Sequence, residues 1–183
     1  MSPNKERAFL LVDRDGVINE DVATSVCREA QFSLIERSVR AIVELSRAGY
    51  GIILITNQAC IGRGDTTDEI VSKIHKSMIE NVVKQGGNIV DIFMCPHTPE
   101  DHCDCRKPLP GLIHQARDKY TIDLTKTWFV GDSKRDIDAA KNAGCIPALV
   151  LTGRGQQTQA EVTGVAVFKD LKAFSEHLLA QQI

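Results

Sequence analysis

Short apolar runs alternate with helical patterns along the whole 183-residue chain. The runs are continuously apolar, which is typical of strands buried on both faces of a parallel sheet. Their alternation with helices predicts an α/β fold: a doubly wound, mainly parallel, Rossmann-like sheet with right-handed crossovers. The expected strands are 8–12, 51–55, 89–94, 127–130, 147–151 and a short 165–167, and the expected helices are 38–48, 67–85, 112–119, 136–142 and 171–179.

The chain length favours one domain, residues 1–183, because a single core usually holds about 100–200 residues. The linker-like stretch 153–163 is too short to separate two domains, and the short segments between motifs leave no room for a large cap domain. Residues 1–7 contain no apolar signal core, so we expect a cytoplasmic protein. No run approaches about 18 apolar residues, so we expect no membrane partner.

The charge and composition restrict the class of partner. The formal net charge is -2 and aromatic residues make up 5% of the chain, which argues against a nucleic-acid partner. We therefore expect a small-molecule substrate and a monomeric protein.

Polar side chains follow the expected strands, at the edge where parallel sheets bind ligands. Asp13 and Asp15 follow the first strand in the sequence Asp-Arg-Asp-Gly, and Thr56-Asn57-Gln58 follows the second. One carboxylate can be a nucleophile while the other transfers a proton, although an Asp-Gly turn and a simple Thr-Asn turn remain alternatives. Lys107 can neutralise a phosphate, and Asp132, with Asp13, can hold a hard cation such as Mg²⁺.

Three cysteines and a histidine crowd one short segment, residues 95–107. A Cys-x-His pair and a Cys-x-Cys pair, separated by five residues, predict a closed tetrahedral zinc site of the structural kind. The expected ligands are Cys95, His97, Cys103 and Cys105. His102 is a competing ligand, free thiols are an alternative, and ligand spacing does not separate zinc from iron.

The ordered set of motifs resembles the haloacid-dehalogenase-like phosphatases from residue 9 to about residue 151. That resemblance implies hydrolysis of a phosphate monoester through an aspartyl phosphate, with Mg²⁺ as cofactor. It implies that Asp13 is the nucleophile and Asp15 the general acid and base. It further implies that Thr56 and Lys107 hold the phosphoryl group, and that the Mg²⁺ ligands are Asp13, the Asp15 backbone carbonyl and Asp132.

The cysteine loop narrows the resemblance to two groups, the heptose 1,7-bisphosphate 7-phosphatases of lipopolysaccharide precursor synthesis and the histidinol-phosphate phosphatases. Both share Asp-Arg-Asp-Gly, Thr-Asn-Gln and Cys-Asp-Cys-Arg-Lys-Pro with this chain. Asn19 and the stretches 61–64 and 149–155 favour the heptose group, although residues 22–24 differ from its usual His-Gly-Tyr. The resemblance assigns substrate contacts to Asn57, Gln58 and Arg106, and leaves open whether Asp136 or Arg63 contributes.

Overall fold

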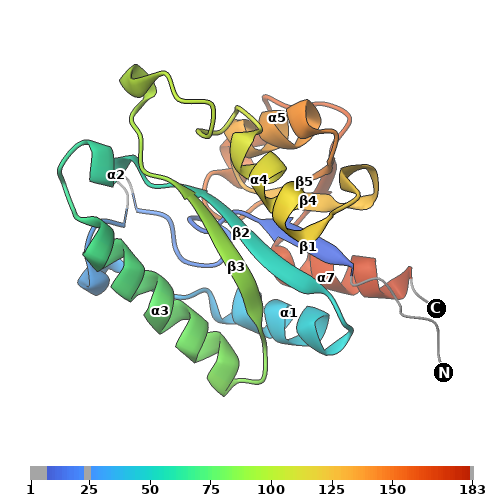
Figure 1. The fold of residues 1–183 in the computed structure, drawn as a ribbon. Helices are drawn as coiled ribbons and strands as arrows, with labels where there is room; N and C mark the ends of the chain where they lie inside the picture. Colours follow the sequence, from blue (N-terminus) through green and yellow to red (C-terminus); the bar gives the residue numbers. More distant parts are fainter. Residues whose placement is uncertain (1–7, 23–25, 182–183) are drawn as a thin grey trace.

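Six parallel strands form one sheet in the computed structural model, which describes residues 8–22 and 26–181 (Figure 1). The strand order is β3-β2-β1-β4-β5-β6, so the chain moves outward in one direction, returns to the centre and continues in the other direction. This order confirms the predicted doubly wound sheet. The strands are β1 (Phe9–Val12), β2 (Gly51–Asn57), β3 (Ile89–Cys95), β4 (Trp128–Gly131), β5 (Ile146–Val150) and β6 (Ala166–Phe168).

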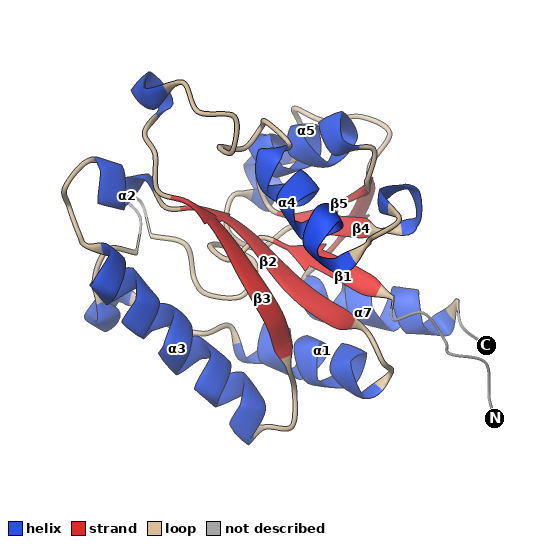
Figure 2. Cartoon of the chain, viewed as in Figure 1, coloured by secondary structure: helices blue, strands red, loops and turns tan. Residues whose placement is uncertain are grey.

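Helices cover both faces of the sheet and form the outer layers of a three-layer fold (Figure 2). The longer helices are α1 (Glu36–Arg47), α3 (Asp68–Lys84), α4 (Gly111–Tyr120), α5 (Lys134–Ala143) and α7 (Leu171–Ala180). The short ones are α2 (Ala59–Gly62) and α6 (Gly155–Thr158), with 3-10 turns η1 (Glu29–Gln31), η2 (Pro99–Asp101) and η3 (Leu124–Lys126).

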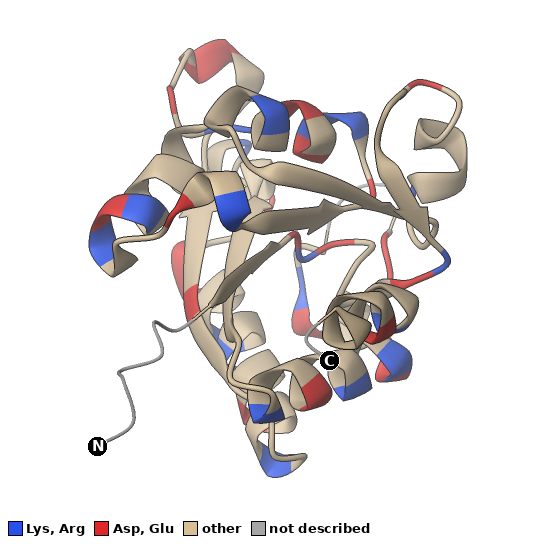
Figure 3. Cartoon of the chain, turned by 90° about the vertical axis from the view of Figure 1, so that its right-hand side faces the viewer, with Lys and Arg blue, Asp and Glu red and all other residues tan. Residues whose placement is uncertain are grey.

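Successive strand residues point to opposite faces and build two separate cores. Leu10 and Val12 of β1 join the core under α1, α3 and α7, whereas Leu11 joins the core under α4 and α5. Charged residues lie on the surrounding helices and loops, and Asp91 is the one charged residue within the strands that the structure describes (Figure 3). Burial on both faces therefore explains the apolar runs of the central strands, whereas most of β3 is half-buried and Ala166 and Val167 of β6 are exposed.

The limits of the helices follow from their caps. The Thr67 side chain accepts a hydrogen bond from the Ile70 backbone N–H and starts α3. Ser133 and Asp136 form a reciprocal capping box at the start of α5. We had expected that helix to begin at Asp136, but Asp136 is its third residue because Ser133 is the N-cap.

Two short helices lie outside the expected ones. Residues 59–62 form α2, and the linker-like stretch 153–163 contains α6. Residues 1–7, on which the expectation of a cytoplasmic protein rests, and residues 23 and 24 of the substrate comparison lie outside the described residues. Within the described part of the chain, every helix is too short or too polar to cross a membrane.

Candidate active site and cysteine cluster

Three neighbouring strands bring the expected site residues to one edge of the sheet. Strand β1 lies between β2 and β4, and Val12 pairs with Leu54 on one side and Val130 on the other. The Asp13 backbone N–H continues this ladder by donating to the Val130 carbonyl at 2.9 Å. The β1–β4 boundary is also where the strand order reverses, which is the usual ligand position in such sheets.

Lys107 lies at the centre of the site, with 3% of its surface exposed. Its Nζ is 2.7 Å from Asp13 Oδ1 and 2.7 Å from Asp136 Oδ1, and it donates to the Ile55 carbonyl at 2.8 Å. These three oxygens surround the ammonium group. The buried positive charge is therefore fixed between two carboxylates. The sequence left open whether Asp136 contributes to the site, and in the structure it belongs to this group.

The inner site carries more negative charge than Lys107 neutralises. Carboxylate oxygens of Asp13, Asp132 and Asp136 all lie within 4.8 Å of one another, and the three residues are buried. Burial, followed by the negative charge of Asp136, raises the pKa of Asp13 to about 7. The same two causes raise the pKa of Asp132 to about 8. A hard divalent cation would offset this excess, so the residues fit such an ion.

Asp132 reaches this cluster through a gap between two glycines. A Cβ atom at Gly16 or Gly153 would lie 2.2 or 2.1 Å from Asp132 Oδ2. Both glycines also have positive φ angles, which glycine adopts without strain. The same Oδ2 accepts from the Arg154 backbone N–H at 2.7 Å. The glycine after the Asp-Arg-Asp motif thus makes room for the opposite carboxylate.

Asp15 is held by three side chains, two from its own loop and one from the start of α2. Arg14 Nη2 is 2.7 Å from its Oδ1 and 2.8 Å from its Oδ2, Asn19 donates to Oδ1 at 2.9 Å, and Gln58 donates to Oδ2 at 2.8 Å. Burial alone would raise the pKa of Asp15, but Arg14, Asn19 and Gln58 together hold it below its usual range. In this structure Asp15 is therefore an ionised, fixed carboxylate.

The polar residues at the end of β2 contact other parts of the site. The Asn57 amide exchanges two 3.1 Å hydrogen bonds with the Lys107 backbone, one to its carbonyl and one from its N–H. Gln58 Nε2 also donates to Thr56 Oγ1 at 2.9 Å. These contacts place Asn57, Gln58 and Thr56 beside the expected catalytic residues, while their contacts to substrate stay a prediction.

Two cavities of opposite charge adjoin at this edge. The inner one, of about 80 Å³, is lined by Asp13, Asp15, Asp21, Asp132, Asp136 and Lys107, among others. The outer one, of about 780 Å³, is lined by the arginines 28, 63, 106, 135 and 154, with Asp65 as its one acidic residue. Asn57, Arg135 and Arg154 line both cavities, so the two lie side by side.

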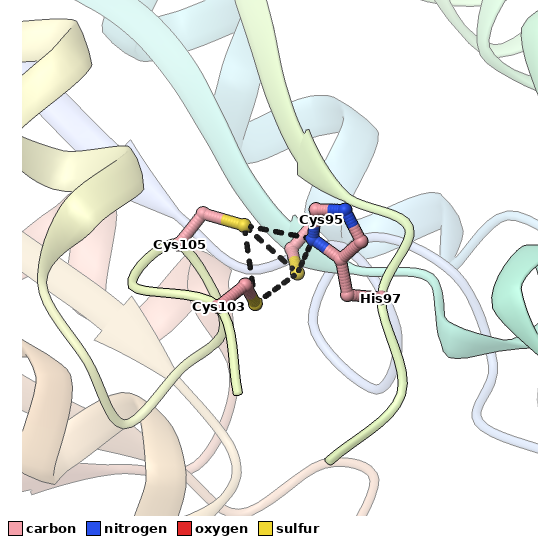
Figure 4. A group of neighbouring side chains, drawn as sticks. All are labelled: Cys95, His97, Cys103 and Cys105. Carbon is pink, nitrogen blue, oxygen red and sulfur yellow. Dashed lines mark hydrogen bonds between the residues drawn. The ribbon is translucent and has the colours of Figure 1, made fainter. Parts of the chain in front are cut away.

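The cysteine loop brings its four expected ligands together after β3 (Figure 4). The three Sγ atoms lie 3.2 to 3.7 Å apart, and His97 Nδ1 is 3.3 Å from Cys105 Sγ and 3.7 Å from Cys95 Sγ. Zinc–sulfur bonds of about 2.3 Å give tetrahedral edges of about 3.8 Å, so the spacing fits a metal of this kind. His102 is exposed and lies outside this group.

The cysteine loop is connected to the outer cavity through Arg106. Arg106 Nη1 donates to the His97 backbone carbonyl at 3.1 Å, and its side chain lines that cavity. The sequence singled out Arg106, and Arg154 fell within the stretch 149–155 that favoured the heptose group. It did not single out Arg28 or Arg135, which lie on separate segments. Their only sequence signal was the presence of basic residues near expected loops.

Comparison with known proteins identifies the family. A family model described as HAD-hydrolase-like matches residues 104–174. A D-glycero-β-D-manno-heptose-1,7-bisphosphate 7-phosphatase of Pseudomonas aeruginosa is 41% identical over 175 residues, which cover 94% of this chain and 98% of the relative. The chain belongs to this family of HAD-like phosphatases. The family prediction made from the Asp-Arg-Asp-Gly and Cys-Asp-Cys-Arg-Lys-Pro motifs is thereby confirmed.

Solved structures of this phosphatase family agree with the fold. The D,D-heptose 1,7-bisphosphate phosphatase of Bordetella bronchiseptica, solved in complex with magnesium and phosphate, superimposes with a TM-score of 0.93. It is 40% identical, and the match covers 95% of this chain and 99% of that chain. A second member, from Burkholderia thailandensis, has a TM-score of 0.75 and 31% identity over 94% of this chain and 99% of its own.

Proposed function

We propose that this chain removes the 7-phosphate of D-glycero-D-manno-heptose 1,7-bisphosphate, in a single catalytic domain acting in the cytoplasm. The observation that carries the proposal is the pair of adjoining cavities: an acidic inner one with a buried lysine, and an arginine-lined outer one. A bisphosphate needs both, one for the phosphate that reacts and one for the phosphate that is retained. The named relatives support the same substrate.

The outer cavity argues against histidinol phosphate as the preferred substrate. Histidinol phosphate carries an ammonium group where a sugar bisphosphate carries a second phosphate. Of the five arginines, Arg63 pairs with Asp65 and Arg154 pairs with Asp21. The other three leave an excess of positive charge that repels a cation and binds an anion, because guanidinium groups hold phosphate oxygens in a bidentate fork. The charge of this cavity therefore favours the bisphosphate.

The first half of the proposed reaction transfers the phosphoryl group to Asp13. An Asp13 oxygen attacks phosphorus, the bond between phosphorus and the sugar oxygen breaks, and Asp15 gives its proton to that oxygen. Lys107 neutralises the Asp13 carboxylate before attack and the phosphoryl oxygens during it. Asp15 must first take up a proton, and the incoming phosphate favours this because a nearby negative charge raises a carboxyl pKa.

The second half regenerates the enzyme. Ionised Asp15 takes a proton from water, the water oxygen attacks phosphorus, and the bond between phosphorus and Asp13 breaks to release inorganic phosphate. The conformation described here suits this half, because Arg14, Asn19 and Gln58 keep Asp15 ionised and fixed. The phosphoryl group thus passes from the sugar to Asp13 and then to water.

Mg²⁺ is the proposed cation of the inner cavity. Asp13, Asp132 and the Asp15 backbone carbonyl would hold it, and the ion would neutralise charge on the transferring phosphoryl group. The excess of buried carboxylates supports this assignment. Asp136 faces Lys107 and caps α5 through Ser133, so we assign it to holding the lysine in place.

Zinc is the proposed ion of the cysteine loop, with Cys95, His97, Cys103 and Cys105 as a closed ligand set. No open position remains for water, so its proposed role is to hold the loop and Arg106 rigid. We expect Cys103→Ser to lower the zinc content from about one ion per chain, to lower Tm, and to raise KM for the bisphosphate about tenfold. Metal analysis, melting curves and phosphate-release kinetics measure these effects.

A matched cysteine variant distinguishes the loss of zinc from a general loss of stability. Cys145 is buried in the core between α5 and β5, outside the cluster. Cys145→Ala should therefore lower Tm without lowering the zinc content or raising KM. A Cys103→Ser protein with wild-type zinc content and wild-type KM would contradict the proposed role of the loop.

Arg106→Ala tests the second phosphate site. We expect this change to raise KM for heptose 1,7-bisphosphate about tenfold or more, because a bidentate phosphate contact is lost. KM for heptose 7-phosphate, which has no second phosphate, should change less than about twofold. Phosphate release from both substrates measures the difference. Equal losses on the two substrates would contradict the proposed subsite and weaken the choice of a bisphosphate.

A further inference from the structure

A buried guanidinium behind the active site takes no direct part in the steps above. Arg14 lies between the two aspartates of the motif, and its side chain is 0% exposed. Its Nη1 is 3.0 Å from His75 Nε2, its Nη2 donates to Gln58 Oε1 at 3.1 Å, and its Nε donates to Asp15 Oδ1 at 3.1 Å. A buried arginine needs a partner on each side of its planar fork, and these three residues supply them.

His75 must act as the acceptor in its contact with Arg14. A guanidinium has donors only, so Nε2 of His75 carries a lone pair and the neutral ring carries its proton on Nδ1. Burial and then the positive charge of Arg14 lower the pKa of His75 to about 4, in agreement with a neutral ring. His75 lies on α3, 61 positions from Arg14 in the sequence, and it is 9% exposed.

The contact between His75 and Arg14 decides how Arg14 meets Asp15. With Nη1 fixed on α3, the other edge of the guanidinium, formed by Nε and Nη2, lies against both oxygens of Asp15. Without His75, Nη1 has no acceptor among the contacts described for it, and the guanidinium can turn to find one. The Asp15 carboxylate would then lose its fixed position.

We infer that His75 is a positioning residue of this phosphatase, which acts through Arg14 to orient Asp15, the group that transfers the proton to and from substrate. The inference rests on the proposed function because it takes the role of Asp15 from there. Helix α3 thus serves the chemistry as well as the core. Gln58, which follows β2, and Asn19 hold the same carboxylate, so the support that His75 gives through Arg14 is one of three.

The test compares His75→Leu, His75→Gln and Met78→Leu. Leucine fills a similar volume without an acceptor, whereas glutamine can place an oxygen near the position of Nε2. Met78 is a fully buried residue on α3, one turn further on, and serves as the packing control. We expect His75→Leu to lower kcat about tenfold with KM within about twofold, because only proton transfer is impaired. His75→Gln should restore most of kcat, and Met78→Leu should keep it.

A second readout does not depend on activity. In ¹⁵N NMR spectra near pH 7, wild-type His75 should show an unprotonated Nε2 and a protonated Nδ1. A protonated Nε2 would overturn the inference. Kinetics are measured on whichever phosphate monoester the wild type hydrolyses fastest. A His75→Leu kcat equal to that of the wild type would overturn the positioning role and leave the proposed function standing. If the best substrate is not the heptose bisphosphate and His75→Leu still loses kcat about tenfold, the positioning role stands and the proposed function is overturned. A wild type that hydrolyses no phosphate monoester would overturn both the positioning role and the proposed function.

Discussion

Replacing Asp13 by asparagine is expected to abolish phosphate release, with kcat reduced at least about 10,000-fold, because the amide does not attack phosphorus. The same change should stabilise the Mg²⁺-free protein. Burial and then Asp136 raise the Asp13 pKa from 3.8 to about 7, so the folded state favours the protonated form. The contribution of protonated Asp13 to the stability of the wild type is therefore lost as pH rises from about 4 through about 7. The amide of the variant does not ionise, so the variant has no such loss.

Two measurements check this combination of effects. Phosphate release gives kcat, and melting curves at pH 8 without Mg²⁺ should show a Tm for Asp13→Asn several degrees above that of the wild type. Adding Mg²⁺ should raise the wild-type Tm more than that of the variant. Asp118→Asn, on the exposed side of α4, is the matched control and should resemble the wild type in both measurements. Substantial activity in Asp13→Asn would refute the proposed nucleophile.

Replacing Lys107 by methionine should reduce kcat about 1,000-fold and also destabilise the fold. The variant removes the charge that neutralises the phosphoryl oxygens, and it leaves Asp13 and Asp136 facing each other without their 2.7 Å partner. Losing one member of a buried ion pair costs roughly 3–5 kcal/mol of unfolding free energy. Urea unfolding at pH 8 without Mg²⁺ measures that loss, and phosphate release measures kcat.

A second change separates the two effects of Lys107. Adding Asp136→Asn to Lys107→Met removes one uncompensated carboxylate, and the amide oxygen can still accept from Ser133 at the start of α5. The double variant should regain part of the stability and none of the activity. Lys134→Met, at the exposed start of α5, is the control for loss of a lysine. Wild-type stability in Lys107→Met would show that the ion pairs contribute little to folding.

Much of the fold could be predicted because the sheet is buried on both faces. Each strand then appears as a short apolar run, and parallel strands place their carboxyl ends at one edge. That rule grouped Asp13, Thr56 and Asp132. The structure brings Asp13 and Asp132 together beside Lys107, whereas the contact described for the Thr56 side chain is with Gln58. The cysteine cluster was equally predictable, because its four ligands lie within eleven residues of sequence.

The parts that could not be predicted depend on contacts between distant segments. His75 gives no sign in the sequence that it meets Arg14, because it occupies an ordinary buried position on an amphipathic helix. Asp136 reads equally well as a helix-capping carboxylate, and it does cap α5 while also facing Lys107. The arginine-lined cavity combines arginines from five separate segments of the chain, and a charge count does not show which of them share a surface.

A comparison of substrates on the wild-type enzyme tests whether the preferred substrate carries two phosphates. Phosphate release with Mg²⁺ is measured for both anomers of D-glycero-D-manno-heptose 1,7-bisphosphate, for heptose 7-phosphate and for histidinol phosphate. We expect a kcat/KM for the better bisphosphate anomer at least about 100-fold above that for histidinol phosphate, because the outer arginines bind the second phosphate and repel the amine. A higher kcat/KM for histidinol phosphate would contradict the choice of a bisphosphate.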